Sequence, residues 1–163
     1  KRNFPENLRK HIDQSKLLPG TIETLYGLKQ KGIYMALVTN TPKSYVEMAS
    51  EHFGFDIYFP VKVTADDVKL HKPNPHSIHK ARRELQDELN TKIKRKEIYY
   101  VGDSLADYQA GTSAGVNVAI INGDKLGGTH ELRKARKLRK LEEILDVIDE
   151  INLTALGKLD VID

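Results

Sequence analysis

The fold is decided by the stretch Glu97-Ile98-Tyr99-Tyr100-Val101-Gly102-Asp103-Ser104-Leu105-Ala106-Asp107-Tyr108-Gln109-Ala110-Gly111. Its first half is apolar and predicts a buried strand, and its second half has a helical pattern. Asp103 and Asp107 stand at the turn between the two halves, where like charges repel each other. A divalent cation removes this repulsion, and oxygen ligands suit Mg²⁺. The stretch therefore predicts a strand, a turn with a magnesium site, and a helix.

Strand and helix patterns alternate through the rest of the chain. Apolar runs at 33–38, 57–63 and 116–121 predict further buried strands. Such alternation is typical of an α/β fold with a doubly wound parallel sheet. After residue 132 the pattern fits either an amphipathic helix or a short strand near Leu138 followed by a helix from Leu141.

The composition excludes several classes of protein. A chain of 163 residues with 39% hydrophobic and 30% charged residues fits one globular domain. No apolar run approaches the roughly 20 residues of a membrane span, and the absence of cysteine fits a cytoplasmic protein. The basic run from Arg133 to Lys140 lacks interleaved aromatic residues and keeps a helical period. We therefore interpret it as a solvated helix face, and expect no contact with nucleic acid.

Polar residues also follow the other predicted strands. Thr39 and Asn40 end the first apolar run, and Lys72 lies in a loop with two prolines. Ligands of open parallel sheets bind beyond the carboxyl ends of the strands, so we expect these residues to meet Asp103 and Asp107 there. Neutral donors, a cation and a metal-binding carboxylate pair suit a phosphoryl group.

Each feature also has a plainer interpretation. A polar turn with a helix cap would contain Asp103 and Asp107 equally well. Thr39 and Asn40 would serve a strand-to-helix cap, and a lysine before proline, such as Lys72, usually lies in a solvated loop. The phosphate interpretation depends on the combination of all of them in one chain.

Three segments in this order resemble the second, third and fourth motifs of the haloacid dehalogenase-like (HAD) hydrolases. They are Val38-Thr39-Asn40-Thr41-Pro42, His71-Lys72-Pro73-Asn74-Pro75 and Gly102-Asp103-Ser104-Leu105-Ala106-Asp107. The phosphoglycolate phosphatase-like branch is the most similar. The resemblance implies a Rossmann-like core over residues 17–150, the remnant of a helical cap over 1–16, and a C-terminal tail over 151–163.

The resemblance also implies an activity, the Mg²⁺-dependent hydrolysis of a phosphomonoester in a small phosphorylated metabolite. Thr39 and Asn40 would hydrogen-bond the transferring phosphoryl group. Lys72 would pair with the phosphate and with the nucleophilic carboxylate, so Thr39 and Lys72 are the expected catalytic residues.

The metal-binding residues follow from the fourth motif in the same way. Asp103 would ligate Mg²⁺, and Asp107 would be a second ligand or would hold a ligating water. Ser104 would support the loop that carries them. These roles are implied by the family resemblance and not by spacing alone.

The chain departs from the family pattern at the first motif, Asp-x-Asp-Gly-Thr, whose first aspartate is the nucleophile. No Asp-Gly dipeptide occurs in the sequence. We expect a chain that starts after this motif and so lacks the first, central strand of the sheet, leaving its neighbours with unpaired facing edges. One alternative is a pseudophosphatase that binds a phosphorylated partner without hydrolysis. Another is that a different strand, such as Lys158–Asp163, fills the gap.

Overall fold

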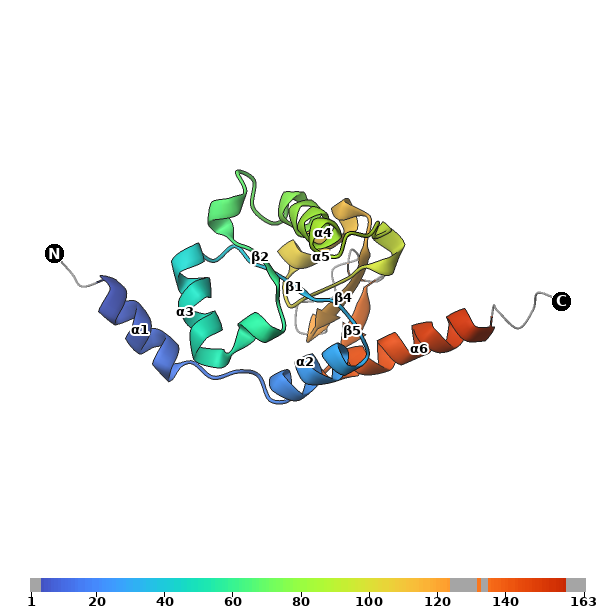
Figure 1. The fold of residues 1–163 in the computed structure, drawn as a ribbon, viewed down its shortest axis with the longest axis horizontal. Helices are drawn as coiled ribbons and strands as arrows, with labels where there is room; N and C mark the ends of the chain where they lie inside the picture. Colours follow the sequence, from blue (N-terminus) through green and yellow to red (C-terminus); the bar gives the residue numbers. More distant parts are fainter. Residues whose placement is uncertain (1–3, 124–131, 133–134, 158–163) are drawn as a thin grey trace.

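Helices and strands alternate along the chain in the computed structural model, which describes residues 4–123, 132 and 135–157 (Figure 1). The helices are α1 (Phe4–Gln14), α2 (Thr21–Gln30), α3 (Lys43–Phe53), α4 (His76–Glu88), α5 (Leu105–Ala114) and α6 (Glu143–Gly157). The strands are β1 (Ala36–Val38), β2 (Val61–Val63), β3 (Tyr99–Gly102), β4 (Asn117–Ile121) and β5 (Arg136–Leu138). Three short 3-10 helices, at Phe55–Ile57, Ala65–Asp67 and Arg95–Glu97, complete the connections.

The strands form two parallel sheets. β1 pairs with β2, and β3, β4 and β5 pair in that order. Within the described residues, no backbone pairing joins β1 to β3. The predicted α/β class with parallel strands is confirmed. The sheet divides where the sequence predicts that its middle strand is missing.

Helices cover both faces of the larger sheet. In β4, Val118 and Ile120 pack toward α5, whereas Ala119 and Ile121 pack toward α2 and α6. This follows from strand geometry, because successive side chains point to opposite faces. A parallel strand buried on both faces is therefore apolar throughout, which is why the run at 116–121 could be recognised. Figure 1 shows α4 and α5 on one side of the strands and α2 and α6 on the other.

Shared apolar clusters hold the two sheets in one body. Val38 of β1 and Tyr100 of β3 both pack against Ile78 of α4 and against Ala110 and Ala114 of α5. A second cluster, on the opposite face, likewise contains residues from both halves of the chain: Leu28, Met35, Tyr99, Val101 and Ile144. The carboxyl ends of the strands in the two sheets therefore lie close together, and the loops that follow them are neighbours.

The basic segment was interpreted wrongly as a helix face. Arg136–Leu138 form β5, which pairs with β4 and buries Leu138 while Arg136 stays exposed. The alternative, a short strand near Leu138 followed by a helix, is confirmed, although α6 begins at Glu143. The open edge of β4 offers backbone partners that outweigh the local helical period. Residues 133–134 and the segment Lys158–Asp163 lie outside the described residues.

In the ranges that the structure describes, no helix is long and apolar enough to cross a membrane.

Candidate functional site

Three loops meet at the carboxyl ends of the strands. The first follows β1, the second precedes α4, and the third joins β3 to α5. Asn40 and Lys72 join the first two loops through a reciprocal pair of hydrogen bonds. The Asn40 Nδ2 donates to the Lys72 carbonyl oxygen at 3.2 Å, and the Lys72 N–H donates to Asn40 Oδ1 at 3.1 Å. The backbone of Lys72 is thereby fixed against the end of β1.

The side chain of Lys72 crosses to the third loop and ends at Asp107. Its Nζ lies 2.6 Å from Asp107 Oδ1 and donates a second hydrogen bond to the Tyr100 hydroxyl at 3.0 Å. The Tyr100 hydroxyl in turn donates to Asp107 Oδ1 at 2.9 Å. The side chains of Lys72 and Asp107 are only 13% and 7% exposed. Lys72, Asp107 and Tyr100 thus form a closed, largely buried triangle, which we call the Lys72 triangle.

The other oxygen of Asp107 organises the start of α5. Asp107 Oδ2 accepts hydrogen bonds from the Ser104 hydroxyl at 2.5 Å, from the Ser104 N–H at 3.2 Å and from the Asp103 N–H at 3.3 Å. Ser104 Oγ accepts from the Asp107 N–H, which completes a capping box. The plainer interpretation of Asp103 and Asp107, a polar turn with a helix cap, therefore holds in part, because the N-cap is Ser104 and Asp107 completes the capping box. It does not exclude a second role, because Asp107 also pairs with Lys72.

The environment fixes the protonation states of Asp107 and Tyr100. Burial by itself would raise the pKa of Asp107, but hydrogen bonds from Lys72 and Ser104 outweigh it and hold this pKa below its usual value. Burial raises the pKa of Tyr100 well above its usual value, and the negative charge of Asp107 raises it further. At neutral pH Asp107 is therefore a carboxylate and Tyr100 a protonated phenol.

Thr39 and Asp103 lie beside the triangle without joining it through their side chains. The Thr39 hydroxyl donates to Thr41 Oγ1 at 2.9 Å and accepts from the Thr41 N–H at 3.1 Å. The Asp103 carboxylate is exposed and makes no hydrogen bond or ion pair with the described residues. The structure therefore brings together Asn40, Lys72 and Asp107, while the Thr39 hydroxyl remains within its own loop.

The two predicted metal ligands differ in what they offer a cation. Both oxygens of Asp107 are engaged by neighbouring donors, whereas the carboxylate of Asp103 is open. Mg²⁺ usually takes one or two carboxylates and keeps several waters. Asp103 fits such a ligand, and nothing tests the metal-binding role of Asp107, which stays a prediction. Over residues 4–123, 132 and 135–157, no three or more histidine, aspartate or glutamate side chains gather into a metal site.

The sequence reasoning missed Tyr100. We expected Tyr99 and Tyr100 to be strand residues at the core, and both rings do pack there, on opposite faces of the sheet. The signal available was the hydroxyl, because a buried tyrosine usually directs its O–H to a partner. The face of the sheet on which each hydroxyl falls depends on the pairing of β3 with β4, which the local sequence does not show.

Gly102 makes room for the Asp107 side chain. A Cβ at Gly102 would lie 2.3 Å from Asp107 Cβ and 2.6 Å from Asp107 Cγ. We expect Gly102→Ala to displace Asp107 and to lower the free energy of unfolding by about 2 kcal/mol, within the usual range for overpacking. Urea unfolding measures this loss. Gly123→Ala is the control, since a Cβ there is 3.4 Å from its nearest neighbours, and equal stability of the two variants would contradict the prediction.

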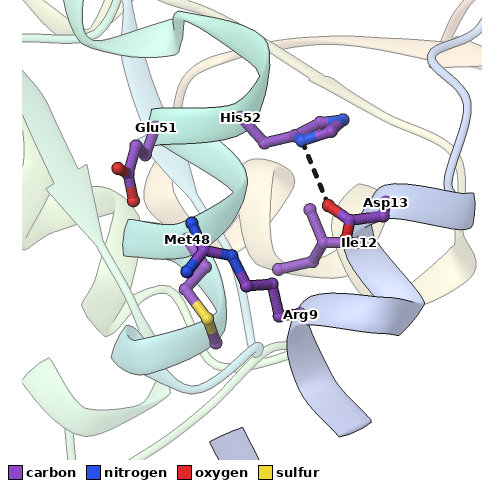
Figure 2. A pocket seen from close by; sticks show the side chains of 6 residues that line it. All are labelled: Arg9, Ile12, Asp13, Met48, Glu51 and His52. Carbon is purple, nitrogen blue, oxygen red and sulfur yellow. Dashed lines mark ion pairs between the residues drawn. The ribbon is translucent and has the colours of Figure 1, made fainter. Parts of the chain in front are cut away.

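A separate cavity of about 230 Å³ lies between α1 and α3. Figure 2 shows its lining, which α1 and α3 provide together: Arg9, Ile12, Asp13, Met48, Glu51 and His52. His52 Nδ1 lies 3.5 Å from Asp13 Oδ1 across it. The cavity contains none of the predicted site residues, and its lining carries charges of both signs.

Comparison with known proteins assigns the chain to a family. The family model of the haloacid dehalogenase-like hydrolases matches residues 2–121. The chain therefore belongs to this family, and the resemblance found in the sequence is confirmed.

The individual relatives that the chain resembles include phosphatases. It is 33% identical over 109 residues to phosphoglycolate phosphatase of Rhodobacter capsulatus, covering 67% of this chain and 46% of that protein. It is 33% identical over 114 residues to the pyrophosphatase PpaX of Halalkalibacterium halodurans, covering 68% and 50%. The chain thus spans about half the length of these curated relatives.

Solved structures agree on the fold. A HAD phosphatase from Thermococcus onnurineus aligns with a TM-score of 0.74 at 29% identity, covering 88% of this chain and 63% of that one. A HAD-superfamily hydrolase of subfamily IA from Geobacter sulfurreducens aligns with a TM-score of 0.69 at 25% identity, covering 86% and 60%. The split into two sheets therefore occurs within a recognised HAD fold.

Proposed function

We propose that the protein containing this chain is a Mg²⁺-dependent phosphatase that hydrolyses a phosphomonoester in a small phosphorylated metabolite. One observation carries the proposal: a largely buried ammonium, Lys72, is held by Asp107 next to the open carboxylate of Asp103. These groups provide a cation for phosphate oxygens and an oxygen ligand for a metal ion. The names of two relatives support phosphoryl hydrolysis, since one acts on phosphoglycolate, a phosphomonoester, and another on pyrophosphate, a phosphoric anhydride.

Each predicted residue takes a definite role in this proposal. Lys72 donates to a phosphate oxygen, and Asn40 fixes the backbone of Lys72 while remaining next to the phosphate position. Thr39 donates to the same phosphate after its hydroxyl turns away from Thr41. Asp103 ligates Mg²⁺, with Asp107 as the second metal residue. When bound, Mg²⁺ supplies Lewis-acid polarisation of the phosphoryl oxygens.

The nucleophile belongs to a segment outside the given residues in this proposal. The sequence contains no Asp-Gly dipeptide, and β1 and β3 have no backbone pairing with each other. A strand that carries the first motif would pair with both of them. Residues 1–16, which include α1, would be the end of a helical cap. The positions of the site loops that follow β1 and β3 would then depend on that added strand.

Removal of the metal tests the proposal on the natural full-length protein. We expect hydrolysis of an aryl phosphate with Mg²⁺, a loss of at least roughly 100-fold on chelation with EDTA, and recovery when Mg²⁺ is added back. A full-length coding sequence without Asp-x-Asp-Gly-Thr, together with no hydrolysis, would contradict a phosphatase. Binding of inorganic phosphate without turnover would then favour the alternative of a non-catalytic pseudophosphatase.

A further inference from the structure

The Lys72 ammonium has one N–H that its neighbours do not use. An ammonium has three N–H donors. One points to Asp107 Oδ1 at 2.6 Å and one to the Tyr100 hydroxyl at 3.0 Å. The described residues offer no acceptor for the third. Since the Lys72 side chain is 13% exposed, this third N–H is the donor that remains for a ligand.

Two acceptors hold the ammonium more firmly than one. Its only rotation is about the Cε–Nζ bond, and each acceptor that engages a proton makes this rotation more costly. Asp107 Oδ1 and the Tyr100 hydroxyl hold two of the protons, and they are themselves joined at 2.9 Å. The orientation of the whole ammonium therefore depends on the Tyr100 hydroxyl as well as on the carboxylate.

We propose that Tyr100 is a positioning residue that fixes the direction in which Lys72 presents its remaining N–H to a phosphate oxygen. This inference rests on the proposed function, because it assigns Lys72 to phosphate. Tyr100 acts through Lys72 and not by touching the substrate.

The surroundings of Tyr100 suit this role. Its ring packs against the cluster of Ile78, Ala110 and Ala114, so packing sets the position of the hydroxyl. A protonated phenol has one O–H donor and oxygen lone pairs that accept. It therefore donates to Asp107 and keeps its oxygen lone pairs for Lys72.

The test compares Tyr100→Phe with Tyr99→Phe in the natural full-length protein. Both substitutions remove only a hydroxyl, and Tyr99 is the next residue of the same strand on the opposite face. We measure kcat and KM for an aryl phosphate with Mg²⁺, and the inhibition constant of inorganic phosphate. In Tyr100→Phe we expect KM and the inhibition constant each to rise roughly tenfold, as for a lost hydrogen bond to a charged group, while kcat changes less than about threefold. Tyr99→Phe should match the wild type within about twofold.

A second readout separates positioning from structural support. In a protein with ¹⁵N-labelled lysine, the Lys72 ammonium should give a slowly exchanging signal that shifts when inorganic phosphate is added. Tyr100→Phe should broaden or abolish this signal, and Lys72→Met identifies it. An active wild type with unchanged KM and an unchanged lysine signal in Tyr100→Phe would overturn the inference alone. A wild type that neither hydrolyses aryl phosphate nor binds phosphate would overturn the proposed function and this inference with it.

Discussion

Substituting asparagine for Asp107 should lower the free energy of unfolding by about 3–5 kcal/mol, the usual cost of removing one partner from a buried ion pair. Asp107 is 7% exposed and Lys72 is 13% exposed, so water cannot replace the lost charge. The new side-chain amide would also place its NH₂ group, a donor, where a carboxylate oxygen accepts hydrogen bonds in the wild type. Donor would then face donor, because both oxygens of Asp107 accept hydrogen bonds. Urea unfolding at neutral pH measures the loss.

A matched control and a double variant isolate the ion pair. Asp87 is exposed on α4, and Asp87→Asn should change stability by less than about 0.5 kcal/mol. Adding Lys72→Met to Asp107→Asn should recover part of the loss, because no buried charge is then left unpaired. A loss below about 1 kcal/mol in Asp107→Asn would show that the pair is not buried in solution.

The same variant changes the acid dependence of stability. The folded-state pKa of Asp107 lies below its unfolded value, which is about 3.9 for aspartate. Its stabilising contribution is therefore complete above roughly pH 4 to 5 and is lost as the pH falls through the folded-state pKa. Asp107→Asn should lack this part of the acid-induced loss of stability.

Asp103→Asn should reduce Mg²⁺-dependent hydrolysis at least roughly 100-fold while leaving the free energy of unfolding within about 0.5 kcal/mol of the wild type. The Asp103 carboxylate is exposed and has no partner among the described residues, so its charge contributes little to stability. Its backbone N–H, which donates to Asp107 Oδ2 at 3.3 Å, is retained in the variant. The substitution thus removes the proposed metal ligand without disturbing the loop.

The dependence of activity on Mg²⁺ concentration sharpens this experiment. If Asp103 ligates the metal, the variant should need a much higher Mg²⁺ concentration for half of its remaining activity, and Asp87→Asn should behave like the wild type. Full activity at unchanged Mg²⁺ requirement in Asp103→Asn would contradict the metal assignment.

The meeting of Lys72 and Asp107 could be predicted from the sequence because it follows from topology. In a parallel sheet the carboxyl ends of the strands share one edge, and Lys72 and Asp107 both lie in segments that follow strands. No detail of packing was needed. The same rule placed Asn40 correctly, since it ends β1 and bonds to the backbone of Lys72.

Other features of the site depend on contacts that the local sequence does not encode. Two adjacent tyrosines give no alternation that would distinguish Tyr100 from Tyr99. Arg136–Leu138 form a strand because they pair with the edge of β4. The spacing of the apolar residues in this segment would equally fit a helix. The hydroxyl of Thr39 can form a hydrogen bond either with Thr41 or with a phosphate. Which of the two it forms depends on the rotamer of the Thr39 side chain, which the sequence does not show.

The position of α2 has a consequence for synthesis on the ribosome. Leu28 of α2 is buried in one cluster with Ile144 and Val147 of α6, and a Cβ at Gly27 would lie 3.2 Å from Leu145. These partners are translated only after most of the described chain, and at 5–20 residues per second that delay lasts several seconds. The part of the α2 surface that packs against α6 therefore stays uncovered throughout that interval. A nascent chain stalled before residue 143 should bind a chaperone for hydrophobic segments, and one that includes α6 should release it.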